Sequence, residues 1–190
     1  MQMDYTANRD GIVKELAKNL KGEKFEHSLG VEETALKLAH RYGANMDQAG
    51  LAGLLHDYTK QMDNAALAKK YGIPYLTEKT LHGHTAAALL KDRGYVTDEE
   101  VLNAIKWHTT GRAGMTMLEK IIYIADYMEP NRDFDGVERL RALAFQNIDK
   151  AVLLGLQTSI GHIVENKSLI DTDSVEAYNY YRNLFPGEEI

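Results

Sequence analysis

The sequence predicts an all-helical fold. Apolar residues recur mostly at spacings of three and four, whereas runs that alternate apolar and polar side chains, as strands do, are hard to find. Only 3 prolines interrupt the 190 residues, and no Ser-, Gly- or Pro-rich linker and no shift in composition divides them. We therefore expect a single domain over residues 1–190, with a core at about 20–135 and C-terminal helices at about 136–185.

The individual helices follow from apolar faces and their stop signals. The first covers 27–42, ends before Gly43, and has one face made by His27, Val31, Ala35, Leu38 and Tyr42. The second begins behind Asp47, a suitable N-cap, and ends near His56. A short helix follows Asp63 and stops at the YGIP stretch. Further helices are expected from about Thr80 to Arg93, from behind Asp98 to His108, at 115–128, at about 136–165 and at about 174–184.

Composition excludes several classes of protein. The net charge is −6, from 28 acidic and 22 basic residues, so a broad nucleic-acid-binding surface is not expected. There is no cysteine, hence no disulfide, and any metal must have nitrogen or oxygen ligands. With no apolar run of 18 residues and no signal-like N-terminal block, we expect a cytoplasmic protein without a membrane partner. The P-loop, G-x-G-x-x-G and H-E-x-x-H motifs are absent.

The stretch LAGLLHDYTKQM, residues 51–62, places His56 and Asp57 at the end of a strongly apolar run. His56 lies one helical turn after Ala52 and shares its inward face. Burying an ionised carboxylate without a partner is costly, and an ion pair or a metal is the usual remedy. By itself, this dipeptide is explained as well by a core histidine beside a capping aspartate.

The same anomaly recurs on three other predicted helices. His27 begins one apolar stripe, His108 ends the stretch VLNAIKWH, and Asp126 follows Ile122 by one turn in LEKIIYIADYM. Each one alone is more often a satisfied core residue or a buried ion pair. Together with His56 and Asp57 they indicate imidazoles and carboxylates converging between helices, which is how helical bundles build divalent metal centres.

The other histidines are less informative. His82 and His84 are two residues apart on a predicted helix, so they point in different directions and at most one faces the same site. Spacing does not say which of the two does so. His40 and His162 have no comparable context, and we interpret both as structural.

The ordered set of His27, His56-Asp57, a histidine near 82, His108 and Asp126 resembles the HD superfamily of metal-dependent phosphohydrolases over about residues 20–135. More narrowly, LLHDYTK, LHGHTAAALL, AIKWHTTGRAGMTMLEKIIYIADYMEPNRDF and LRALAFQNIDKAV resemble the YqeK family of HD-domain symmetrical bis(5'-nucleosyl)-tetraphosphatases. The resemblance implies an HD-domain helical bundle with a metal site between helices. It also implies a nucleotide substrate, diadenosine tetraphosphate, cleaved into two ADP.

The resemblance carries metal ligation to four residues of this chain: His27, His56, Asp57 and Asp126. The family's LLHG-type motif matches Leu81-His82-Gly83, which favours His82 over His84. His82 and His108 then complete a second metal position or contact substrate phosphate. The family suggests iron. Mixed imidazole and carboxylate ligation suits iron, manganese, nickel or zinc, and the number of ions, one or two, stays open.

Further residues beside these ligands are candidates for catalysis or substrate binding. Asp57 can orient the attacking water, and Lys60, three residues later, can clamp phosphate, unless it is an ordinary solvated lysine. The HTTGR motif offers hydroxyls and a guanidinium, although it is equally a loop that ends a helix. Arg132 can bind phosphate bidentately, or else pair with Asp133 or Asp135. The expected substrate-binding set is Lys60, His82, His108, Thr109, Thr110, Arg112 and Arg132.

Two residues depart from the family pattern, and other functions compete with the expected one. Ser174 and Tyr178 stand where the family tends to have a threonine and an arginine, which puts the contacts to base and ribose in question. The competing functions are another HD phosphohydrolase, a nucleotidase or an alarmone hydrolase, and a nucleotide-sensing module without turnover. The product would resemble ADP or GDP, and the sequence is compatible with a homodimer.

Overall fold

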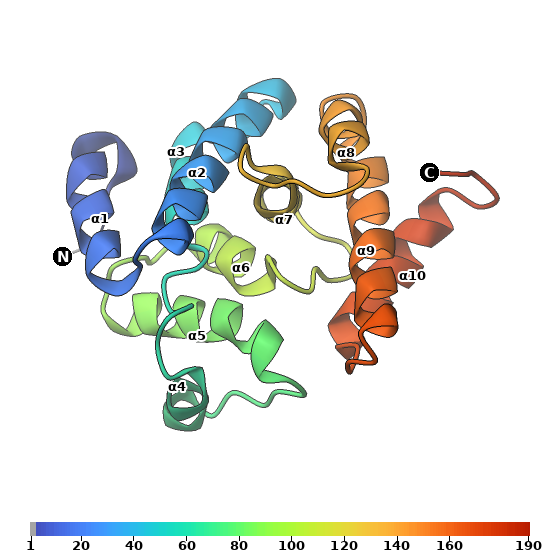
Figure 1. Ribbon diagram of the computed structural model, residues 1–190. Coiled ribbons are helices and arrows are strands. Elements are labelled where there is room, and N and C mark those ends of the chain that lie inside the picture. Colours follow the sequence, from blue (N-terminus) through green and yellow to red (C-terminus); the bar gives the residue numbers. More distant parts are fainter. Residues whose placement is uncertain (1–2) are drawn as a thin grey trace.

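The computed structural model describes residues 3–190, and these residues form ten α-helices and no strand (Figure 1). The all-helical prediction is therefore confirmed. The helices are α1 (Tyr5–Asn19), α2 (Glu23–Tyr42), α3 (Met46–Leu55), α4 (Asn64–Tyr71), α5 (Glu78–Asp92), α6 (Glu99–Trp107), α7 (Met117–Met128), α8 (Val137–Ala144), α9 (Ile148–Glu165) and α10 (Thr172–Leu184).

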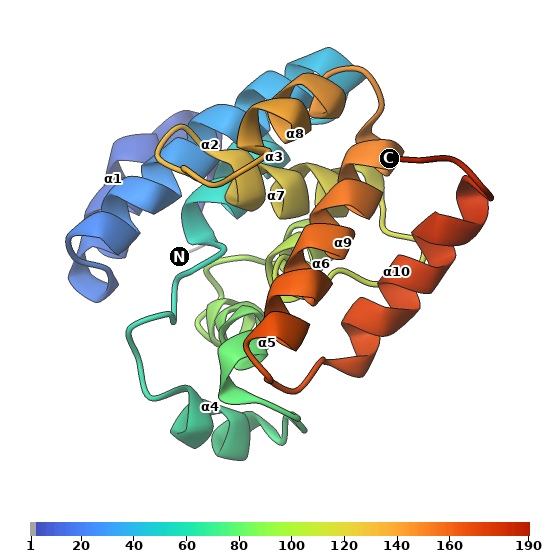
Figure 2. The ribbon, with the colours of Figure 1, turned by 45° about the vertical axis from the view of Figure 1, so that its right-hand side comes forward.

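Helices α2, α3, α6 and α7 form the centre of the molecule. The helix α2 packs on α3 and α7, and α6 packs on α3, α5 and α7. The helices α9 and α10 lie side by side at one end of the bundle, with α1 at the opposite end (Figures 1 and 2). One continuous apolar core runs from Ile12 in α1 to Tyr181 in α10.

Local signals explain where the helices begin and end. The side chains of Asp63 and Asp98 accept backbone N–H groups at the starts of α4 and α6, as expected of N-caps. Gly43 ends α2 with φ of 65°, a left-handed conformation that suits glycine. The expected cap of α3 was wrong: Asn45, not Asp47, accepts the first N–H groups of that helix.

Two predicted helix boundaries are also wrong. The single helix expected at 136–165 is two helices, because Asn147 accepts the N–H of Lys150 with its side chain and starts α9 anew. The apolar periodicity continues across this break, so the sequence pattern does not indicate a second helix. The helix expected to begin at His27 begins at Glu23, directly after Gly22, whose φ is 57°.

The helix α1 was not predicted at all. It buries only Ile12 and Leu16, and Asn8 within it departs from helical geometry, so its apolar pattern is weak. A tertiary contact secures it instead. The buried carboxylate of Glu32 accepts hydrogen bonds from Tyr5 Oη at 2.7 Å and from the Arg9 guanidinium at 2.6 Å.

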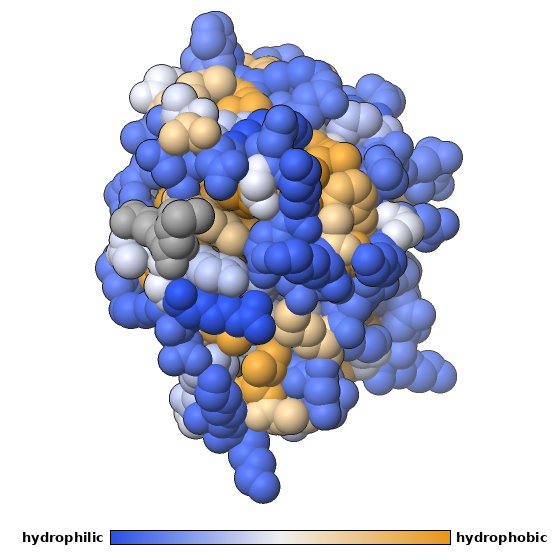
Figure 3. Space-filling view, turned by 90° about the vertical axis from the view of Figure 1, so that its left-hand side faces the viewer, coloured by the Kyte–Doolittle hydropathy of each residue, from blue (hydrophilic) through white to orange (hydrophobic). Residues whose placement is uncertain are grey.

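The outer surface is mainly polar. Figure 3 shows a largely hydrophilic face on the left-hand side of Figure 1, interrupted by apolar patches. Among residues 3–190, none of the helices combines the length and the apolar character needed to cross a bilayer.

Candidate metal centre and active site

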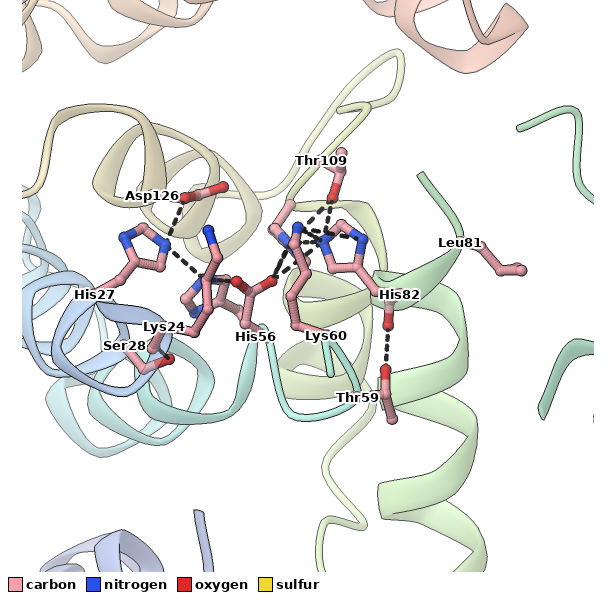
Figure 4. A network of polar contacts seen from close by, with 12 residues as sticks. Lys24, His27, Ser28, His56, Thr59, Lys60, Leu81, His82, Thr109 and Asp126 are labelled. Carbon is pink, nitrogen blue, oxygen red and sulfur yellow. Dashed lines mark hydrogen bonds and ion pairs between the residues drawn. The ribbon is translucent and has the colours of Figure 1, made fainter. Parts of the chain in front are cut away.

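Six side chains from five helices or their ends converge in the middle of the bundle (Figure 4). The helix α2 supplies His27, and α5 supplies His82. His56 and Asp57 directly follow the end of α3, His108 follows the end of α6, and Asp126 lies in the last turn of α7. All are buried except Asp126, which is partly exposed.

One half of this cluster is centred on His27. Its Nε2 lies 2.9 Å from Asp126 Oδ1 and 3.2 Å from His56 Nε2. His56 Nε2 is in turn 3.7 Å from Asp57 Oδ2. Two sets of potential ligands, His27/His56/Asp57 and His56/His108/Asp126, each have their nitrogen and oxygen atoms within 4.8 Å of one another.

The other half is centred on the second oxygen of Asp57. Its Oδ1 lies 3.1 Å from His82 Nε2 and 3.5 Å from His108 Nε2. The two imidazole Nε2 atoms are 3.0 Å apart. Asp57, His82 and His108 form a third set of potential ligands. Asp57 therefore belongs to both halves, one oxygen toward each.

Hydrogen bonds on the far sides of the rings orient three of the imidazoles. His56 Nδ1 lies 2.8 Å from Gly53 O, and His108 Nδ1 lies 2.7 Å from Ile105 O. His27 Nδ1 lies 3.1 Å from the carboxylate of Glu129. A carbonyl or carboxylate partner requires Nδ1 to carry the proton, so each neutral ring turns the lone pair of Nε2 toward the cluster.

The donor set fits a divalent cation. Lone pairs of neighbouring neutral imidazoles repel one another, and Asp57 Oδ1 is buried without a hydrogen-bond partner. A cation relieves both costs, since buried charges are normally paired or coordinate a metal. Imidazole nitrogen with carboxylate oxygen suits first-row divalent metals. The structure thus supports a divalent metal site here.

Burial and neighbouring charge put four of the ligands in their binding forms. His27 is the exception: burial lowers its pKa, but the carboxylates of Asp126 and Glu129 outweigh burial and raise it. Burial lowers the pKa of His56 to about 3 and also lowers the pKa of His82, so both rings are neutral near pH 7. For Asp57 and Asp126 burial opposes ionisation, but the surrounding imidazoles outweigh it and hold each pKa well below its usual value. Neutral imidazoles and ionised carboxylates are the forms that metals bind.

Comparison with known proteins agrees with this geometry. Residues 25–131, more than half of the chain, match the family model described as "HD domain".

The chain belongs to the HD-domain family.

Relatives in this HD-domain family share most of its length. The proteins named "Bis(5'-nucleosyl)-tetraphosphatase, symmetrical" from Halalkalibacterium halodurans and Staphylococcus aureus are 35% and 38% identical, over 90% and 88% of this chain and 96% and 92% of theirs. A crystal structure from Clostridium acetobutylicum, described as a predicted HD superfamily hydrolase involved in NAD metabolism, is 36% identical with a TM-score of 0.86. It covers 93% of this chain and 98% of that one. The family resemblance seen in the motifs is confirmed.

Cationic and hydroxyl side chains surround the HD cluster. Lys60 Nζ lies 2.8 Å from His82 Nε2 and 3.6 Å from Asp57 Oδ1. Thr109 Oγ1 lies 3.1 Å from His82 Nε2 and 3.0 Å from His108 Nε2. Arg132 donates to Asp126 Oδ1 at 2.7 Å and to the Asp126 carbonyl at 2.9 Å, rather than to either neighbouring aspartate.

Two predicted substrate-binding residues are engaged elsewhere. Arg112 makes a bidentate ion pair with the buried carboxylate of Glu119, at 2.9 to 3.1 Å. Glu119 in turn completes the capping box that starts α7. Thr110 is buried, and its hydroxyl donates to Gly111 O at 2.9 Å. These contacts order the loop between α6 and α7, so Arg112 and Thr110 are better explained as structural residues.

The alternative histidine, His84, lies outside the cluster. Its ring packs edge-on against Trp107, with centroids 4.9 Å apart, and burial lowers its pKa to about 4. His82 is the one of the pair that reaches Asp57.

Sequence reasoning missed several residues of the site. Glu129 follows Asp126 by three positions, directly after the last residue of α7, so its closeness in the sequence was a usable signal. Lys24 precedes His27 by one turn, and Figure 4 shows its side chain extending toward the cluster. The residues of α9 that border the site gave no signal, because their contact with it exists only in the folded chain.

A cavity of about 360 Å³ opens beside the cluster. The HD residues His108 and Asp126 line it, together with Arg132 and an aromatic pair formed by Tyr127 and Phe134. Residues of α9, among them Ser159 and His162, close its other side. His162, read from the sequence as structural, therefore borders the site.

Proposed function

We propose that this chain is a metal-dependent hydrolase that cleaves diadenosine tetraphosphate symmetrically into two ADP. The observation that carries the proposal is the buried cluster in which Asp57 joins two sets of metal ligands. It lies beside cationic side chains and an open cavity. Relatives named as symmetrical tetraphosphatases align with about nine tenths of the chain.

The residues divide into two groups around the reaction centre. His27, His56, Asp57 and Asp126 would hold a first ion. Asp57, His82 and His108 would hold a second ion, or else His82 and His108 would contact phosphate directly. A bound divalent metal lowers the pKa of water and stabilises charge on the attacked phosphate.

The remaining side chains act on the substrate. Four linked phosphates carry several negative charges, and the net charge of the chain is −6, so binding requires local cations. Lys60 and Arg132 supply them at opposite ends of the cluster, since Lys60 contacts His82 and Arg132 contacts Asp126. The Thr109 hydroxyl can donate to a phosphate oxygen. Asp57, at the centre, can orient the attacking water.

For the metal itself we propose iron, as the family resemblance suggests. The ligand set of four imidazoles and two carboxylates supports iron but suits manganese, nickel and zinc as well. Elemental analysis of protein purified without added metal identifies the ion and the number bound per chain. Zinc alone would contradict the proposed iron without affecting the proposed reaction.

Product analysis tests the activity. Metal-loaded protein is incubated with diadenosine tetraphosphate, and the nucleotides are separated by ion-exchange chromatography. ADP as the only product is expected, and ATP with AMP would contradict symmetrical cleavage. The Asp57→Asn variant is the control for a contaminating hydrolase. Preferential hydrolysis of a nucleoside monophosphate or an alarmone would indicate a different HD phosphohydrolase, and tight binding without turnover would indicate a sensing module.

A further inference from the structure

A second cavity lies next to the first. We call the cavity beside Tyr127 and Phe134 the aromatic hollow. The second, which we call the polar hollow, has a volume of about 500 Å³ and lies between the start of α5, the end of α9 and the start of α10. The two hollows share one wall, formed by Thr109, Ser159 and His162.

Both hollows border the reaction centre, the aromatic hollow through cluster ligands and the polar hollow through a residue that contacts the cluster. The aromatic hollow meets the cluster through Asp126 and His108. The polar hollow meets it through Thr109, whose hydroxyl lies 3.1 Å from His82 Nε2. Figure 4 shows both residues along the same side of the cluster, Asp126 toward the His27 end and Thr109 toward the His82 end. The two hollows are therefore neighbours that flank one row of ligands.

We propose that the aromatic hollow and the polar hollow bind the two nucleosides of a single dinucleoside tetraphosphate. The inference rests on the proposed function, because symmetrical cleavage places the central bridging oxygen at the cluster. Each nucleoside then lies two phosphates away from that oxygen, on opposite sides. A site with one hollow would hold only half of such a substrate.

The aromatic hollow binds its base by stacking. Tyr127 and Phe134 are both partly exposed, and their rings meet edge to face with centroids 5.5 Å apart. A base that stacks on such a ring gains binding energy whatever its identity, because every base has a π-face. Arg132 lies in the same hollow and supplies positive charge for the adjoining diphosphate.

The polar hollow must bind its nucleoside differently. None of the described residues that line it is phenylalanine, tyrosine or tryptophan. Its walls present the Asn166 amide, the Ser168 hydroxyl and the nearly buried Ser174. Lys79 on α5 contacts Ser168 in the wall of the hollow, where Nζ donates to Oγ at 3.4 Å. Hydrogen bonds to base and ribose, rather than stacking, therefore set the specificity here, and Ser174 is one of the two positions that depart from the family pattern.

Binding of ADP to the metal-loaded protein tests the proposal. Isothermal titration should show two ADP molecules per chain in the wild type. Ser168→Trp puts a large side chain into the wall of the polar hollow beside Lys79 and should reduce the number to one. Thr6→Trp, on the exposed surface of the distant helix α1, is the matched control and should still bind two. One ADP in the wild type, or two in folded Ser168→Trp, would overturn the proposal.

Kinetics provide an independent comparison. Adenosine 5'-tetraphosphate has one nucleoside, which we expect to occupy the aromatic hollow. Ser168→Trp should raise KM for diadenosine tetraphosphate at least tenfold and leave KM for adenosine 5'-tetraphosphate within a factor of two. Phe134→Ala should raise both. Equal effects of Ser168→Trp on the two substrates would count against separate hollows.

The two hypotheses fail in different ways. A wild-type protein that binds two ADP but hydrolyses neither tetraphosphate would refute the proposed function but not the assignment of one nucleoside to each hollow. A protein that releases two ADP from diadenosine tetraphosphate but binds only one ADP at saturation would support the proposed function and refute the two nucleoside sites.

Discussion

The Gly30→Ala substitution tests whether Glu129 controls metal binding through His27. A methyl group on Gly30 would lie 2.5 Å from Glu129 Oε2, whereas ordinary contact begins at 3.4 Å. The carboxylate would have to retreat from α2 by roughly an ångström. His27 is also on α2, one turn earlier, and its Nδ1 contacts the other oxygen, Oε1, at 3.1 Å. If the whole carboxylate retreats, this contact lengthens to about 4 Å, beyond hydrogen-bond distance. Loss of such an outer partner typically costs about 10- to 100-fold in metal affinity.

The affinity for Mn²⁺, measured by titration calorimetry on metal-free protein, is the assay. Gly161→Ala is the matched control, because it is also a helical glycine but its methyl group meets nothing within 4 Å. That control should keep its metal affinity and gain up to about 1 kcal/mol of stability.

A double-mutant cycle makes the comparison sharper. In a Glu129→Ala background the clash is gone, so Gly30→Ala should cause no further loss of affinity. Wild-type affinity in Gly30→Ala, or additive losses in the double variant, would refute the role assigned to Glu129.

Four more outcomes are expected. His56→Ala should remove bound metal and hydrolysis together, and retention of full metal content, measured by elemental analysis, would contradict the ligand assignment. Arg132→Ala should raise KM about 10- to 100-fold with a smaller change in kcat, as for a charge-assisted phosphate contact worth about 1.5–3 kcal/mol. An effect on kcat alone in steady-state kinetics would contradict the role of Arg132 in binding phosphate. Arg9→Ala removes a hydrogen-bond partner of buried Glu32 and should lower the free energy of unfolding in urea by about 1–3 kcal/mol. An unchanged midpoint would show that Tyr5 alone satisfies the Glu32 carboxylate. Metal-free protein should lose stability as the pH falls from about 6.5 toward 3. Burial lowers the pKa of His56 in the folded protein to about 3 from 6.5, so in this range the unfolded chain binds more protons than the folded one. Equal unfolding midpoints at pH 7 and pH 5 in EDTA would exclude this.

The sequence alone determined the helical class and most of the candidate metal ligands. Helices are local structures, so their apolar faces repeat along the chain and can be read without a fold. The same periodicity identified His56, His108 and Asp126 as candidates, because a histidine or carboxylate at the end of an apolar stripe is costly to bury without a partner. Family motifs added His82.

Only the tertiary structure decided how these side chains are held and what surrounds them. The carboxylate of Glu129 orients an imidazole 102 positions away, and Arg112 proved to be bound to Glu119 instead of facing the site. The helix α1 forms with little apolar pattern because Glu32 ties it to α2. The two hollows exist because α9 and α10 pack beside the HD core. Contacts between residues distant in the chain depend on packing of whole helices, which leaves no periodic trace in the order of the amino acids.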